Sequence, residues 1–215
     1  MKKMIIGIAF LFSIFTVVFL TKAEENTATI VVLDAGHGGM DGGASIGNIN
    51  EADLTLAIVK KTKEIFEKNG IKVILTRENE DDLSADEFVK KEDMLKRVSI
   101  INSSNAKLAL SIHLNKFSVE KYRGAQVFFS KANEINSFFA ETMQKSLIAY
   151  LKNTDRKIVK RDNIFLLNKV VIPCCIVECG FMSNRDELAL IQTEEYQYKL
   201  AYALLYGVED FLKLY

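Results

Sequence analysis

The stretch TIVVLDAGHGGMDGG, residues 29 to 43, joins an apolar, β-rich run to a loop that contains five glycines. Runs of Val and Ile bounded by glycine predict a strand that ends where the loop begins. Glycine adopts backbone angles that other residues avoid, so the chain can turn sharply after this strand. His37, one of only two histidines in the 215 residues, lies inside the loop. We expect the turn to bring His37 inward and to leave open space for a bulky substrate.

Downstream of this loop, predicted helices and strands alternate. Asn50 has the position of a helix N-cap, and apolar residues at helical spacing follow it until Asn69-Gly70. Further strands are predicted at 71–76, 108–112, 125–129, 164–167 and 174–177, and further helices near 94–101, 135–151, 186–191 and 194–214. This alternation predicts an α/β fold: a single domain with a largely parallel central sheet of about six strands, flanked by helices.

Residues 1–23 have the pattern of a targeting segment. Lys2 and Lys3 precede an apolar run over 4–20, and Ala23 precedes Glu24. This order is typical of a signal peptide cleaved after Ala23, although the run, at 17 residues, is also at the short limit for a membrane-spanning anchor. Both interpretations predict export. Residues 24–28 are then a polar linker, and 29–215 form one catalytic domain.

Charge and cysteine content exclude several classes of protein. The chain carries 28 basic and 28 acidic residues, and without residues 1–23, which hold three lysines, the balance is 25 to 28, or −3. Bulk positive charge for binding nucleic acid is therefore missing. Cys174, Cys175 and Cys179 are too few and too close together for a disulfide framework or a thiolate zinc site. We expect them to be buried strand residues.

Four reactive side chains are predicted at one edge of the sheet. His37 follows the first strand, Glu51 opens the next helix, His113 ends the third strand and Glu178 ends the last one. The carboxyl ends of parallel strands, and the starts of the helices that follow them, meet at the same rim. We therefore expect these residues to converge, although they are far apart in the chain.

Two imidazoles and a carboxylate are a common zinc-binding set that leaves the fourth position to water. This predicts that His37, Glu51 and His113 bind Zn²⁺. Glu178 remains as the carboxylate that takes a proton from the water and returns it to a leaving amine. Asp34 could orient a ligand histidine or cap the turn. Serine-hydrolase and nucleotide-binding motifs of the GxSxG and GxxxxGK[ST] types are missing from the sequence.

These motifs, taken in order, resemble the zinc-dependent N-acetylmuramoyl-L-alanine amidases of the Amidase_3 type over about residues 29–215. The resemblance rests on LDAGHGGMDGGA, Asn50-Glu51, LTR at 75–77, Arg97, Asn102, LALSIHLN, Gly124-Ala125, RDNIFLLN and IPCCIVECGFMSN. It implies Zn²⁺ bound by His37, Glu51 and His113, with Glu178 as the catalytic residue. It also implies hydrolysis of the amide bond between the lactyl group of N-acetylmuramic acid and L-alanine of the peptidoglycan stem peptide.

A single catalytic domain behind an N-terminal signal is most similar to the CwlD-type sporulation and germination amidases. That resemblance implies a role in forming muramic-δ-lactam in spore cortex. The protein would be exported to the cell envelope or to the intermembrane space of the developing spore. Contact with a membrane is expected only through residues 1–23, and a metal with three protein ligands would allow an activator protein. Two alternatives remain: a non-catalytic peptidoglycan-binding or scaffold module, and a zinc peptidase that cuts within the stem peptide.

Overall fold

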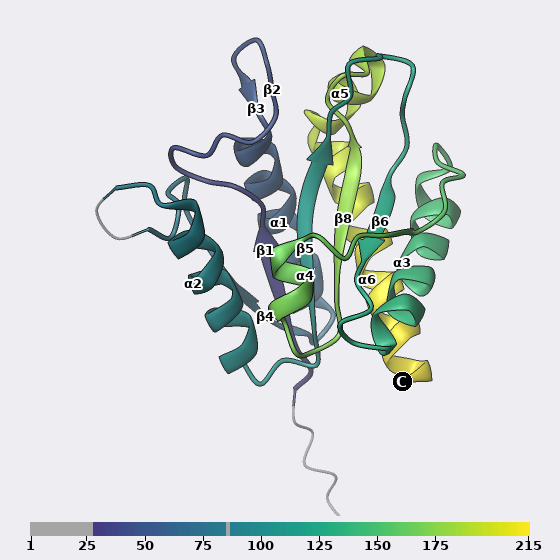
Figure 1. Ribbon diagram of the computed structural model, residues 1–215. Coiled ribbons are helices and arrows are strands. Elements are labelled where there is room, and N and C mark those ends of the chain that lie inside the picture. The colour runs from purple at the N-terminus through teal and green to yellow at the C-terminus, as the bar shows by residue number, and fades with distance from the viewer. Residues whose placement is uncertain (1–27, 85–86) are drawn as a thin grey trace, which may run out of the picture.

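The computed structural model describes residues 28–84 and 87–215, and their core is one twisted sheet (Figure 1). The predicted signal or anchor at 1–23, and residues 24–27 of the linker, lie outside the described residues. Within the described ranges, six strands form the sheet in the order β4-β1-β5-β8-β6-β7. Their bounds are β1 Ile30–Ala35, β4 Lys72–Leu75, β5 Leu108–Asn115, β6 Gln126–Phe129, β7 Val159–Lys160 and β8 Cys174–Phe181.

All neighbouring strands of this sheet run parallel except β6 and β8, which are antiparallel. The predicted α/β domain with a largely parallel sheet of about six strands is therefore confirmed. The parallel register places Asp34 of β1 beside Ser111 of β5, and His113 of β5 beside Glu178 of β8. The ends of β1, β5 and β8 thus meet at one rim, as expected.

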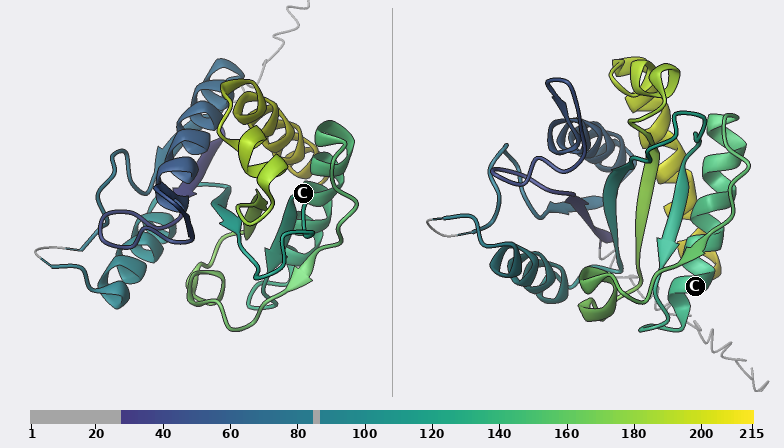
Figure 2. Two further views of the ribbon diagram at one scale, coloured as in Figure 1. Left: turned by 90° about the horizontal axis from the view of Figure 1, so that it is seen from above. Right: turned by 45° about the horizontal axis from the view of Figure 1, so that its top comes forward.

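Helices cover both faces of the sheet (Figure 2). Three long helices, α1 (Glu51–Lys68), α3 (Ile135–Leu151) and α6 (Glu194–Leu214), pack on one face, and α2 (Lys90–Ser103) and the short α4 (Phe165–Lys169) pack on the other. Because both faces are covered, the strands are nearly continuous apolar runs. In β1, for example, Val31 and Leu33 pack into the first core, between the sheet and α1, α3 and α6. Val32 packs into the second core, between the sheet and α2 and α4.

Helix α1 begins directly after a small hairpin formed by β2 (Ser45–Ile46) and β3 (Ile49–Asn50). Asn50 is the N-cap residue, as predicted, and its backbone is extended. Its side chain serves the hairpin rather than the helix, because Oδ1 accepts a hydrogen bond from the Ser45 hydroxyl. The hairpin therefore fixes where α1 starts, and with it the position of Glu51.

The strand predicted at 164–167 is wrong. Ile164 is extended, but the following residues form α4, which buries Leu166 and Leu167 against the second core. A short apolar run has no clear period, so a strand and a buried helical turn look alike in sequence. The sixth strand is instead β7, a two-residue strand that pairs with β6.

The three cysteines are core residues, as expected. Cys174, Cys175 and Cys179 are free and fully buried in β8.

The helix expected near 186–191 is α5 (Arg185–Ile191), which follows β8 at the same rim as the predicted site. In the ranges 28–84 and 87–215, every helix is too short or too polar to cross a membrane.

Candidate metal centre and active site

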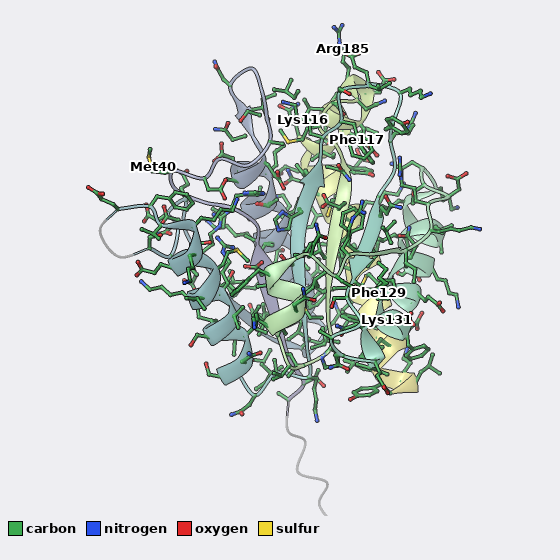
Figure 3. The ribbon with its side chains drawn as sticks, viewed as in Figure 1. Met40, Lys116, Phe117, Phe129, Lys131 and Arg185 are labelled. Atoms are coloured by element: carbon green, nitrogen blue, oxygen red, sulfur yellow. The ribbon has the colours of Figure 1, made fainter. Side chains whose placement is uncertain are left out.

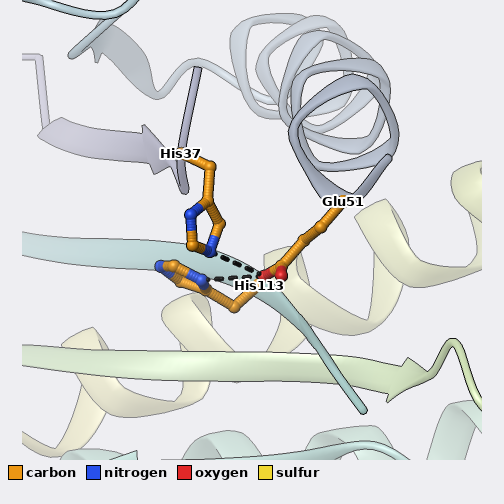
Figure 4. A group of neighbouring side chains, drawn as sticks. All are labelled: His37, Glu51 and His113. Atoms are coloured by element: carbon orange, nitrogen blue, oxygen red, sulfur yellow. Dashed lines mark hydrogen bonds and ion pairs between the residues drawn. The ribbon is translucent and has the colours of Figure 1, made fainter. Parts of the chain in front are cut away.

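His37, Glu51 and His113 come together at the rim of the sheet (Figure 4). Each offers one ligand atom, and these atoms all lie within 4.8 Å of one another. Nε2 of His37 is 3.2 Å and Nδ1 of His113 is 3.0 Å from the same carboxylate oxygen, Oε1 of Glu51. The two rings meet edge to face, with centroids 5.0 Å apart. The convergence expected from the strand ends is thus observed for these three side chains.

The surroundings of Glu51 hold its carboxylate in place for such a cluster. Oε2 accepts a hydrogen bond from the backbone N–H of Ala44, and Oε1 accepts one from Leu114. Burial alone would raise the pKa of Glu51, but hydrogen bonds with His113 and His37 outweigh burial and hold the pKa below its ordinary range. Two imidazole nitrogens directed at one ionised oxygen form a donor set that fits a divalent cation such as zinc. The three residues could therefore hold a metal ion.

Two glycines of the opening stretch are required by these side chains. A Cβ at Gly36 would overlap the imidazole ring of His113. A Cβ at Gly43, whose φ is +67°, would lie 2.7 Å from both Oε2 of Glu51 and the ring of His37. Glycine is therefore needed at these two positions, because the predicted metal ligands already occupy the space that a side chain would fill.

His37 itself adopts the left-handed conformation, with φ of +62°. This backbone directs the imidazole inward, whereas Met40, at the tip of the same loop, points outward and is 82% exposed (Figure 3). Nδ1 of His37 lies 3.0 Å from Asp41, at ion-pair distance but without hydrogen-bond alignment, and Lys90 approaches the same carboxylate at 3.7 Å. No role for Asp41 was predicted from the sequence. Its position four residues after His37, in the same glycine loop, was the signal that could have indicated contact between the two side chains.

Asp34 has neither of the two roles considered from the sequence. Its carboxylate accepts hydrogen bonds from Thr76 (2.6 Å), Ser111 (2.5 Å) and the guanidinium of Arg97 (2.8 Å). Burial would raise its pKa, but the charge of Arg97 and the two hydroxyls hold the pKa below the usual value. Asp34 is therefore part of a buried ionic network beneath the loop, rather than a turn cap or a direct partner of an imidazole.

Glu178 lies on β8 next to His113 on β5 and lines the same cavity as both histidines. This cavity has a volume of about 310 Å³. Oε2 of Glu178 is buried, and it has no hydrogen-bond partner among the residues that the structure describes. Burial raises the pKa of Glu178 from 4.5 to about 7. A carboxyl group that titrates near neutral pH beside a potential metal site can both accept and donate a proton.

The same cavity is also lined by apolar side chains from α2, β8 and the start of α4: Met94, Ile164, Phe165, Leu166 and Ile176. The site therefore combines the polar side chains of His37, His113 and Glu178 with apolar surface that can hold part of a larger substrate.

Comparison with known proteins identifies the family. Residues 31–210 match the N-acetylmuramoyl-L-alanine amidase family, Amidase_3. The chain belongs to this family. It is 34% identical over 225 residues to the germination-specific N-acetylmuramoyl-L-alanine amidase of Bacillus subtilis, a match that covers 97% of this chain and 95% of that protein. It is 29% identical to the N-acetylmuramoyl-L-alanine amidase AmiA of Escherichia coli, over 83% of this chain and 74% of that protein.

Solved amidase structures have the same fold. The CwlD amidase of Clostridioides difficile, solved in complex with the GerS lipoprotein, is 38% identical and superimposes with a TM-score of 0.83, covering 87% of this chain and 100% of that one. An N-acetylmuramoyl-L-alanine amidase of Clostridium difficile 630 is 31% identical, with a TM-score of 0.78, covering 86% and 97%. The expected resemblance to CwlD-type amidases and the expected enzyme class, a peptidoglycan amidase, are thereby confirmed.

Proposed function

We propose that this amidase hydrolyses the bond between the lactyl group of N-acetylmuramic acid and L-alanine of the stem peptide in a zinc-dependent reaction. His37, Glu51 and His113 would hold the Zn²⁺, and Glu178 would be the catalytic acid and base. The observation that carries the proposal is the meeting of three ligand-type side chains within 4.8 Å, beside a cavity that also contains an unpartnered carboxylate oxygen.

Bound zinc would polarise the amide carbonyl and lower the pKa of a water molecule at the fourth position. Oε2 of Glu178, which makes no protein hydrogen bond in the described ranges, is free to accept the proton of that water. The same carboxyl can then donate the proton to the alanine nitrogen as the bond breaks. A pKa of about 7 suits both steps, because general acid–base catalysis is most effective when the pKa is near the working pH.

The products of peptidoglycan digestion test this proposal. Purified protein lacking residues 1–23 is incubated with intact peptidoglycan, and the soluble products are identified by mass spectrometry. Free, full-length stem peptides are expected. Shortened stems would instead indicate a peptidase acting within the stem, and failure of folded, zinc-loaded protein to release any product would favour the binding or scaffold module. Loss of products after chelation, with recovery on adding Zn²⁺, tests the metal.

We further propose a role in spore formation, in which removal of stem peptides leads to muramic-δ-lactam in the cortex. The support is the similarity, over almost the whole chain, to the germination-specific amidase of Bacillus subtilis. The protein would act in the cell envelope, in the intermembrane space of the developing spore, and residues 1–23 would direct it there as a cleaved signal or a retained anchor. Muramic-δ-lactam analysis of cortex from a strain lacking this protein tests the role, and unchanged lactam content would refute it.

An activator protein is proposed on separate grounds. The similar CwlD amidase of Clostridioides difficile was solved in complex with the GerS lipoprotein. In addition, if a metal ion is bound weakly by only three protein ligands, a partner protein could increase the affinity for it. Affinity purification of this protein from sporulating cells, followed by measurement of zinc content with and without the captured protein, tests this proposal. Equal zinc content and equal activity in both samples would contradict it.

A further inference from the structure

Three consecutive backbone carbonyls of the glycine loop are bound by two arginine side chains. Arg97 donates to the carbonyl of Ala35 at 2.6 Å and to that of His37 at 2.5 Å. Arg77 donates to Ala35 at 3.0 Å and to Gly36 at 3.1 Å. The two guanidinium groups thus bind every backbone carbonyl from Ala35, the last residue of β1, to His37.

The same contacts reach the helix that carries Glu51. Nη2 of Arg77 also donates, at 2.8 Å, to the carbonyl of Ala52, the residue directly after Glu51. Thr55, one turn further along α1, donates its hydroxyl to the carbonyl of Gly36 at 2.9 Å. Arg77 and Thr55 therefore connect the His37 loop to the first turn of α1.

These arginines are buried charges, and their surroundings differ. Arg97 is 2% exposed and is paired with Asp34 and Asp93 at 2.8 and 2.7 Å. Arg77 is 3% exposed, yet its hydrogen-bond partners in the described ranges are backbone carbonyls and one hydroxyl, not a carboxylate. A buried cation without an ionic partner normally lowers stability. What Arg77 provides in return is the connection between the loop and α1, whose carbonyls it binds.

The loop needs such support because His37 is left-handed. A residue with a Cβ is strained in this conformation relative to the right-handed form. A hydrogen bond from a charged donor is stronger than one between neutral groups and can offset such strain. The contact from Arg97 to the carbonyl of His37 acts on the strained residue itself.

We propose that Arg77 and Arg97 are positioning residues, which hold the backbone of His37 at the distance from Glu51 that metal binding requires. The inference rests on the proposed zinc site. Neither arginine is a metal ligand in this account; both act on the metal site through the loop carbonyls. Loss of partners that orient metal ligands typically lowers metal affinity about 10- to 100-fold.

The test compares zinc affinity with the stability of the metal-free protein. The variants are Arg97→Lys, Arg77→Lys and Thr55→Val. The last is nearly isosteric and removes only the hydroxyl, with its contacts to Gly36, Ala52 and Arg77. Gln144→Met is the matched control: Gln144 is 4% exposed and bonds the backbone of Ala125 and Val127 from α3, next to β6, which β5 and β8 separate from β1. Zinc affinity is measured by competition with a chromogenic chelator, and the unfolding midpoint of each metal-free variant is measured by circular dichroism.

We expect both arginine variants to bind zinc about 10- to 100-fold more weakly and Thr55→Val a few-fold more weakly. Gln144→Met should lower the unfolding midpoint without changing zinc affinity. Unchanged affinity in the folded arginine variants would overturn the inference and leave the proposed function intact. If neither arginine variant folds, Thr55→Val decides, and wild-type affinity in that variant is the refuting result. Failure of the unsubstituted protein to bind zinc would overturn the proposed metal chemistry as well.

Discussion

Replacing Glu178 by glutamine should stabilise the metal-free protein at alkaline pH but not at acidic pH. Burial raises the pKa of Glu178 from 4.5 to about 7, so the folded state binds a proton at this site more tightly than the unfolded state does. As pH rises from about 4.5 to about 7, the unfolded state loses its proton first, and the folded state becomes less stable relative to it. Above pH 7 the full cost is present.

The size of this effect follows from the same pKa. The difference between the ordinary value of 4.5 and the folded value of about 7 corresponds to roughly 3 kcal/mol, at about 1.4 kcal/mol for each pKa unit. Glutamine is neutral throughout this range, so Glu178→Gln removes the titration. Any constant cost of burying the amide is the same at every pH. The stability difference between variant and wild type should therefore change by roughly 3 kcal/mol between pH 4.5 and pH 8.

Urea unfolding in the presence of a chelator measures this difference. Far-UV circular dichroism is the suitable signal, because the chain contains no tryptophan. Glu195→Gln, at the exposed start of α6, is the control for removing an acid from the surface. A difference between Glu178→Gln and wild type that stays constant from pH 4.5 to pH 8 would refute the reasoning, since it would mean that Glu178 ionises in the folded state as it does in solvent.

Three further predictions concern the zinc-loaded enzyme. Glu178→Gln should keep its zinc, measured by elemental analysis, but release stem peptide about 10²- to 10⁴-fold more slowly, and a normal rate would exclude an acid–base role. His113→Ala should lose zinc together with activity, and full zinc occupancy would show that this imidazole is not a ligand. Gly36→Ala should disturb the ring of His113, with which the new methyl group overlaps, and weaken zinc binding; wild-type affinity in a chelator competition assay would contradict this account of the glycine.

The long elements of the fold were predictable because their patterns are long enough to have a clear period. Helices α3 and α6 have the predicted bounds, and the strand before the glycine loop was recognised from its β-branched residues. The run at 164–167 was not, since four apolar residues fit a strand and a helical turn equally well. The two-residue strand β7 has no sequence pattern of its own and exists through its pairing with β6.

The site divides in a similar way. The sequence by itself determined which side chains meet, because His37, Glu51, His113 and Glu178 stand at strand ends or at a helix start, and parallel topology brings those points to one rim. Only the tertiary structure decided what holds them there. The contacts from Arg77 and Arg97 to the loop span 41 to 62 residues, and no local pattern specifies where a long, flexible side chain ends once it is buried.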